Sequence, residues 1–64
     1  MKQYKFSELK KGELYCTLNG EYIQFIGMRN KYLATFAVCD GDVNGLYPTS
    51  ETYELTEREL KFEY

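Results

Sequence analysis

The dipeptide Asn19-Gly20 lies between two apolar runs and constrains the fold of this chain more than any other feature. Both residues tolerate the positive φ angles of a type I′ turn, so the pair predicts a hairpin with a two-residue loop. We therefore expect antiparallel strands at residues 14–18 and 21–28. A third run at residues 32–39 extends this sheet, so three consecutive strands form the centre of the predicted fold.

The predicted register gathers apolar side chains on one face of the sheet. In the first hairpin Cys16 lies opposite Ile23, and in the second Phe25 lies opposite Phe36. The second pairing follows from the pattern, because a slip of one residue would move every side chain to the other face. The expected inner face consists of Leu14, Cys16, Ile23, Phe25, Phe36 and Val38.

The opposite face of these strands carries no charged side chain, although a solvated sheet face normally alternates to polar residues. Two interpretations are open. Either the sheet bends at Gly27, so that both faces line a barrel, or part of this face is an exposed apolar patch that marks an interface. The uncharged face consists of Tyr15, Thr17, Tyr22, Gln24, Ile26, Met28, Leu33, Thr35, Ala37 and Cys39.

Both ends of the chain add short strands. Residues 2–6 and 60–64 alternate polar with apolar side chains, as half-buried strands do. A helical turn is expected at residues 7–12, and the spacing from Thr56 to Glu59 matches the capping box of another. We predict a single all-β domain over residues 1–64. It is expected to be a small antiparallel barrel of five or six strands, with one or two single helical turns, and it resembles the Src-homology-3-like architecture.

Charge is distributed unevenly along the chain. Residues 1–11 hold four lysines and one glutamate, a net charge of +3, whereas residues 40–64 hold seven acidic and two basic residues, a net charge of −5. We expect the two ends to lie side by side and to neutralise each other. No run has the length of a signal peptide or of a membrane span, so we expect a cytoplasmic protein.

The residue types argue against several activities. The chain has no histidine, so a Ser–His or Cys–His nucleophile cannot be assembled. Cys16 and Cys39 cannot complete a four-ligand zinc site by themselves, and the predicted register places them on opposite faces, out of reach of a disulfide. No glycine-rich phosphate loop is present. We therefore predict no enzymatic activity and no catalytic residue.

The segment from Asp40 to Glu51 resembles the calcium-binding loop of the EF-hand family. The matching residues of the pattern D-x-[DN]-x-[DN]-G-x₅-E are Asp40, Asp42, Asn44, Gly45 and Glu51. The resemblance implies a Ca²⁺ site in which oxygens of the acidic and amide side chains, and the backbone carbonyl of Leu46, are ligands. EF-hand loops connect two helices, whereas β-type runs flank this one. A plain acidic hairpin connection is the alternative interpretation.

Protein binding is the function that the sequence favours, because Tyr and Met are enriched at the buried centres of interfaces. The partner would be another protein or a second copy of the chain in a homodimer. Small acidic chains of this kind are similar to adaptors or inhibitors that phages or mobile elements direct at host proteins. The predicted docking residues are Tyr15, Tyr22, Ile26, Met28 and Leu33.

Binding of single-stranded nucleic acid is the remaining alternative. Exposed tyrosines such as Tyr15, Tyr22 and Tyr32 could stack on bases, but such sites also need a positively charged groove. Only Arg29 and Lys31 lie near the central strands, and the chain is acidic overall. We therefore expect nucleic acid to bind weakly.

Overall fold

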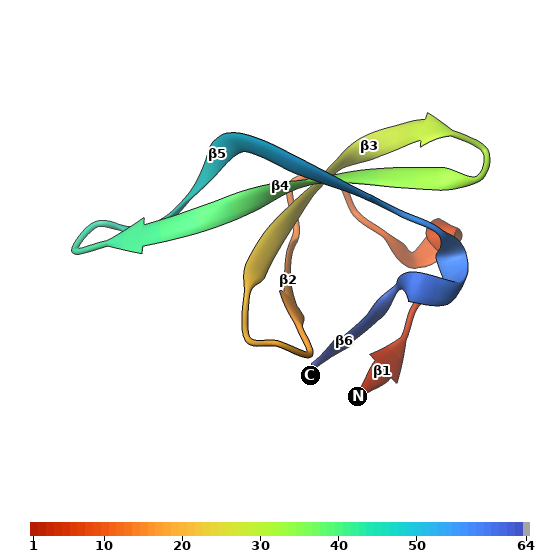
Figure 1. Cartoon of the computed structure of the whole chain (residues 1–64), viewed down its shortest axis with the longest axis horizontal. Coiled ribbons are helices and arrows are strands. Elements are labelled where there is room, and N and C mark those ends of the chain that lie inside the picture. The colour runs from red at the N-terminus through yellow and green to blue at the C-terminus, as the bar shows by residue number, and fades with distance from the viewer. Residues whose placement is uncertain (64) are drawn as a thin grey trace.

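The computed structural model describes residues 1–63 and contains one antiparallel sheet of six strands with two single 3-10 turns (Figure 1). The elements in chain order are β1 (Lys2–Gln3), η1 (Phe6–Glu8), β2 (Leu14–Thr17), β3 (Tyr22–Asn30), β4 (Leu33–Asp42), β5 (Gly45–Leu55), η2 (Glu57–Glu59) and β6 (Lys61–Glu63). The strand order in the sheet is β1-β6-β2-β3-β4-β5. The predicted all-β class is confirmed.

The sheet is bent but not closed into the predicted barrel. Within the described residues, β1 and β5 are its two edges and do not pair with each other. Closure needs a continuous ladder, and β1 contains only two residues, both of which pair with β6. Figure 1 shows β4 and β5 along one side of the molecule and β1, β2 and β6 along the other, with β3 running from one side to the other.

The core lies between these two sides and is largely aromatic. Phe36 on β4 and Phe62 on β6 are almost completely buried, and Tyr15 on β2 joins them. The ring centroids are 5.8 Å apart for Phe36 and Phe62 and 5.1 Å apart for Tyr15 and Phe62. Aromatic pairs at such distances add about 0.5–1.5 kcal/mol to the free energy of burial. Three strands that are not all neighbours in the sheet are thereby held together.

The predicted register of the first hairpin is wrong by one residue. Cys16 pairs with Tyr22 rather than with Ile23, and Ile23 pairs instead with Tyr15. A slip of one residue exchanges the two faces of a strand. Tyr15 therefore faces the core, while Leu14 and Cys16, expected inside, lie on the opposite face of β2.

The turn explains this difference. Its loop has three residues, 18–20, and the amide of Gly20 donates a hydrogen bond of 2.9 Å to the carbonyl of Thr17. Gly20 has a φ of 86°, whereas no non-glycine residue among residues 1–63 has a positive φ. A type I turn followed by a left-handed glycine is a common hairpin loop, and it does not require a positive φ at Asn19.

The predicted register of the second hairpin is confirmed in its central part. Phe25 pairs with Phe36, and Ile23 pairs with Val38. The buried rings of Phe25 and Phe36 have centroids 5.4 Å apart, so this cross-strand pair contributes to the core.

Nearer its turn, β3 departs from strict alternation. The register shifts between Phe25 and Gly27, next to the expected bend, and shifts again beyond Met28. Met28 consequently pairs with Ala34, whose side chain is fully buried. Ala34 does not belong to the predicted uncharged face, so Met28 does not lie opposite a residue of that face. Each extra residue in a β-bulge disturbs the alternation of sides along the strand. The predicted face therefore does not persist along the whole of β3.

The two chain ends lie side by side, as predicted. β1 pairs with β6, and the backbone amide of Phe6 donates a hydrogen bond of 2.7 Å to the carboxylate of Glu57. Direct ion pairs do not hold the two ends together, because the only ion pair within residues 1–63 joins Arg29 to Glu54 at 2.7 Å. Backbone pairing thus brings the oppositely charged ends together.

The capping box predicted at the last helical turn is confirmed. The backbone amide and the hydroxyl of Thr56 each donate a hydrogen bond of 2.9 Å to the carboxylate of Glu59. These bonds, with the backbone bond first, lower the pKa of Glu59. The turn η2 redirects the chain from β5 into β6, and so places Phe62 in the core.

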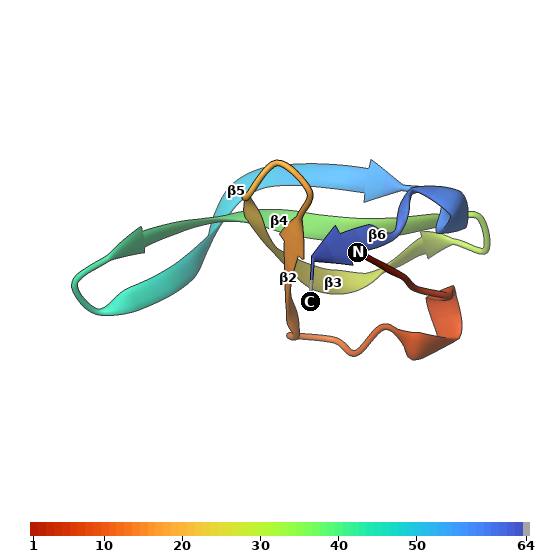
Figure 2. The ribbon, with the colours of Figure 1, turned by 90° about the horizontal axis from the view of Figure 1, so that it is seen from below.

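Beyond the core, β4 and β5 continue as a projecting hairpin, which we call the arm (residues 39–48; Figure 2). Asp42 pairs with Gly45 at its tip, and Val43 is fully exposed there. No helix in the part of the chain that the structure describes is both long and apolar enough to cross a lipid bilayer.

Replacing Phe36 by alanine is expected to lower the free energy of unfolding by about 3–5 kcal/mol, because the substitution leaves a cavity at the centre of the aromatic core. Urea denaturation followed by circular dichroism measures this loss. The matched control is Tyr32→Ala, since Tyr32 is 66% exposed and its loss should change stability by no more than about 0.5 kcal/mol. Equal effects of the two substitutions would contradict the assigned core.

Candidate functional site

A groove of about 400 Å³ lies beside β2, next to the end of β6. The last described residue of β6, Glu63, pairs with Cys16 on β2, and the groove follows the preceding part of β2. Its lining consists of Tyr4, Glu13, Leu14, Tyr15, Cys16, Tyr22 and Glu63. We call this feature the β2 groove.

The alternation of side chains along β2 builds this groove. Tyr15 points into the core and forms part of the floor, and the ring of Tyr4 meets it edge-on with centroids 5.3 Å apart. Leu14 lies on the opposite face of the strand and is 45% exposed. Tyr22, across the ladder from Cys16, is 46% exposed. The wall of the groove thus combines aromatic and aliphatic surface that is open to solvent.

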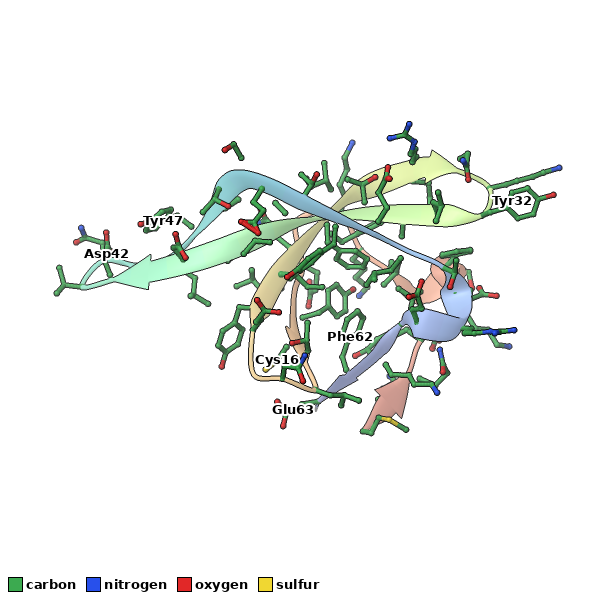
Figure 3. The ribbon with its side chains drawn as sticks, in the orientation of Figure 1. Cys16, Tyr32, Asp42, Tyr47, Phe62 and Glu63 are labelled. Atoms are coloured by element: carbon green, nitrogen blue, oxygen red, sulfur yellow. The ribbon has the colours of Figure 1, made fainter. Side chains whose placement is uncertain are left out.

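Cys16 and Glu63 form the polar part of the groove. The thiol of Cys16 donates a hydrogen bond of 3.2 Å to Oε2 of Glu63, and Figure 3 shows the two side chains close together where β2 and β6 meet. This bond, followed by partial burial and the negative charge of Glu63, raises the pKa of Cys16. A raised pKa keeps the thiol protonated at neutral pH, and a protonated thiol is a poor nucleophile.

A smaller hollow of about 240 Å³ adjoins the β2 groove and shares Tyr4, Glu13 and Tyr15 with it. Lys2 and Lys10 also line this hollow. The ammonium nitrogen of Lys2 lies 4.6 Å from the centroid of the Tyr4 ring, a cation–π geometry. One tyrosine at the edge of the groove therefore already contacts a cation.

Another hollow, of about 290 Å³, lies where the bent sheet is not closed. Ile23 and Phe62 form apolar parts of its lining, and Tyr53 on β5 forms another. The hydroxyl of Tyr53 donates to the carboxylate of Glu21 at 3.3 Å, and the charge of Glu21 is the main cause that raises the pKa of Tyr53. This hydrogen bond joins the β5 edge to the start of β3 across the gap.

The five predicted docking residues do not form one surface. Tyr15 is 7% exposed and belongs to the core. Tyr22, Ile26 and Met28 are exposed by 46%, 41% and 42%, but only Tyr22 lines the β2 groove. Leu33 is half-buried beside the second turn.

Sequence reasoning missed five residues that line the groove: Tyr4, Glu13, Leu14, Cys16 and Glu63. A hairpin loop of three residues ending in Gly20 would have placed Leu14 outside, next to Tyr22. Tyr4 and Glu63 reach the groove because β1 pairs with β6 and β6 pairs with β2. No local sequence pattern reveals the pairing of β6 with β2.

The structure does not bring the predicted calcium ligands together. Four of them, Asp40, Asp42, Asn44 and Leu46, lie in the arm, where the backbone amide of Asn44 donates a hydrogen bond of 2.8 Å to Asp42, and Leu46 pairs with Gly41. Thr52, the residue after Glu51, pairs with Ala37, which lies five residues before Asp42 on β4. Five residues of a strand span on the order of 15 Å, so Glu51 is far from Asp42. Residues 1–63 contain no cluster of three or more acidic, cysteine or histidine side chains that could hold a metal ion.

The three tyrosines proposed to stack on bases, Tyr15, Tyr22 and Tyr32, are also dispersed. Tyr32 lies at the far end of the β3–β4 hairpin, away from the groove (Figure 3), and Lys31 lies over its ring at 5.3 Å. Tyr15 is only 7% exposed, so Tyr22 is the only one of the three proposed base-stacking tyrosines that both lines the groove and is exposed. The arrangement lacks the continuous aromatic platform that stacked bases need.

Comparison with known proteins gives no match, whether to a protein-family model, to a curated protein or to a solved structure. The β2 groove and the exposed side chains near it are therefore the basis for a functional proposal.

Replacing Glu63 by glutamine is expected to lower the pKa of Cys16 toward its ordinary value, because the substitution replaces the carboxylate that accepts the thiol hydrogen bond and also removes its negative charge. Alkylation of Cys16 by iodoacetamide at mildly alkaline pH should become several-fold faster. Mass spectrometry on a Cys39→Ser background reports on Cys16 alone.

The matched control for this experiment is Glu13→Gln, which removes a groove carboxylate that makes no hydrogen bond to the thiol. Its alkylation rate should remain close to that of the parent. An unchanged rate in the Glu63→Gln protein would contradict the role assigned to Glu63.

Proposed function

We propose that this protein is a small, non-enzymatic protein-binding module, an adaptor or an inhibitor, that docks on its partner through the β2 groove and the adjoining surface of β3. The observation that carries the proposal is the exposure of Leu14 and Tyr22 at 45% and 46% beside a groove of about 400 Å³. Exposed apolar and aromatic surface of this kind is characteristic of protein interfaces.

The chemistry of the groove supports a binding role over a catalytic one. Its only sulfur nucleophile, Cys16, is held as a thiol by Glu63. Carboxyl groups that act in general acid–base catalysis are commonly enclosed in apolar surroundings. Glu13 and Glu63, the carboxylates of the lining, are both exposed to solvent instead.

The finer architecture and the compartment are part of the same proposal. A helical turn before the last strand and the pairing of the two chain ends support a partly open relative of the Src-homology-3-like barrel. Cys16 and Cys39 are both free, which fits a reducing compartment such as the cytoplasm.

The double substitution Leu14→Ala and Tyr22→Ala is expected to weaken partner binding about tenfold or more, because truncation of exposed apolar and aromatic side chains at the centre of an interface removes hot-spot contacts. The partner is first captured on immobilised protein, and its affinity is then measured with purified components by calorimetry. Light scattering at several concentrations shows whether the partner is a second copy.

The matched control is Tyr32→Ala, which removes a more exposed tyrosine at the opposite end of β3 and should leave the affinity unchanged. Circular dichroism verifies that both variants remain folded. Partner affinity that is unaffected by the double substitution would show that another surface is responsible for docking.

A further inference from the structure

We propose that the β2 groove binds an arginine side chain presented by an extended segment of the partner protein. This inference rests on the proposed function and specifies the chemistry of its ligand. The groove combines tyrosine rings, two carboxylates and an exposed leucine, a combination that suits a planar cation followed by an apolar neighbour.

The charge of the lining favours a cationic ligand. Glu13 and Glu63 are the only charged residues of its lining, and the nearby Lys2 and Lys10 belong to the adjoining hollow. Both carboxylates are exposed, and the single ion pair found in residues 1–63 is the distant one between Arg29 and Glu54. The carboxylates are therefore not neutralised by a basic side chain of the described chain within ion-pair distance.

Hydrogen-bonding capacity is also available for a ligand. The thiol of Cys16 occupies Oε2 of Glu63 only, and the recorded hydrogen bonds of Glu13 involve its backbone, with Lys10 and Phe25. An arginine guanidinium has five N–H donors in a planar fork, so it can reach a carboxylate with two parallel hydrogen bonds. Arginine suits this lining better than lysine, which offers a single point charge.

The aromatic rings provide the second contact. Tyr4, Tyr15 and Tyr22 line the groove together with the carboxylates. Lys2 already contacts the Tyr4 ring at 4.6 Å, so the ring offered to a guanidinium is that of Tyr22, which is 46% exposed. A guanidinium can stack on a tyrosine face while its N–H groups point to the carboxylates at the rim.

Leu14 extends the site along β2. It is 45% exposed and lines the same groove, so a residue next to the arginine in an extended segment would find an apolar contact. An extended ligand fits an open groove along a strand better than a compact one does, because successive side chains of a strand-like segment point alternately toward and away from the surface.

The test uses the capped peptide Ac-Gly-Leu-Arg-Leu-Gly-NH₂ as probe, titrated into ¹⁵N-labelled protein. We expect saturable shifts in the amide signals of residues 13–22, with an affinity in the millimolar range or tighter, which is about that of a single anchoring side chain. The matched peptide carries citrulline in place of arginine, which keeps the shape and removes the charge. It should bind about tenfold more weakly or not at all.

Variants of the protein test the carboxylates. Glu13→Gln and Glu63→Gln should each weaken the arginine peptide several-fold, and the double variant should abolish the shifts. Glu51→Gln is the matched control, because it removes an equal charge from β5 without touching the groove. Equal binding of the arginine and citrulline peptides, shifts outside residues 13–22, or full binding by the double variant would each overturn the proposal.

These outcomes separate the inference from the proposed function. If the peptide fails in these ways while the Leu14→Ala and Tyr22→Ala protein still loses its partner, the surface binds protein through apolar contacts and only the arginine assignment is overturned. If light scattering finds a dimer that the arginine peptide does not dissociate, a second copy is not the source of the cation and the assignment to a separate partner is supported. Dissociation of the dimer by the arginine peptide would show that the groove binds the second copy, and would overturn the assignment to a separate partner.

Discussion

The packing of Phe62 against Phe36 and Tyr15 is the interaction on which the rest of the structure depends. The sheet is not closed by hydrogen bonds between its edges, so side chains must hold its two sides together. Phe62 arrives on a strand of three residues and is only 1% exposed, with ring centroids 5.1 and 5.8 Å from its two partners. In a domain this small, a few aromatic contacts make up a large share of the core.

The β2 groove is a consequence of the same packing. Because successive residues of a strand point to opposite faces, the inward position of Tyr15 requires Leu14 and Cys16 to point outward. The β2–β6 ladder that buries Phe62 also brings Glu63 to Cys16. The core and the groove therefore both depend on the register of β2, and a change in that register would alter both.

Sequence patterns predicted the elements whose signals are local or strongly apolar. The pairing of Phe25 with Phe36 was predictable because a slip of one residue would move the buried rings to the other face. The first hairpin was not, since a glycine at position 20 fits both a two-residue and a three-residue loop. The spacing of acids from Asp40 resembled a calcium loop, but ladder pairing along β4 and β5 holds those residues in an extended hairpin. The groove depends on contacts between distant segments, which periodicity does not encode.

The register of the first hairpin is the central claim, because it decides which side chains form the core and which form the groove. Nuclear Overhauser effects between α-protons test it directly, since these protons approach closely at the non-hydrogen-bonded pairs of an antiparallel ladder. The hydrogen bond from Thr17 to Glu21 makes Cys16 and Tyr22 such a pair. A strong effect between the α-protons of Cys16 and Tyr22 is the predicted result. A strong effect between the α-protons of Thr17 and Tyr22, the non-hydrogen-bonded pair that a two-residue loop would create, would contradict this account.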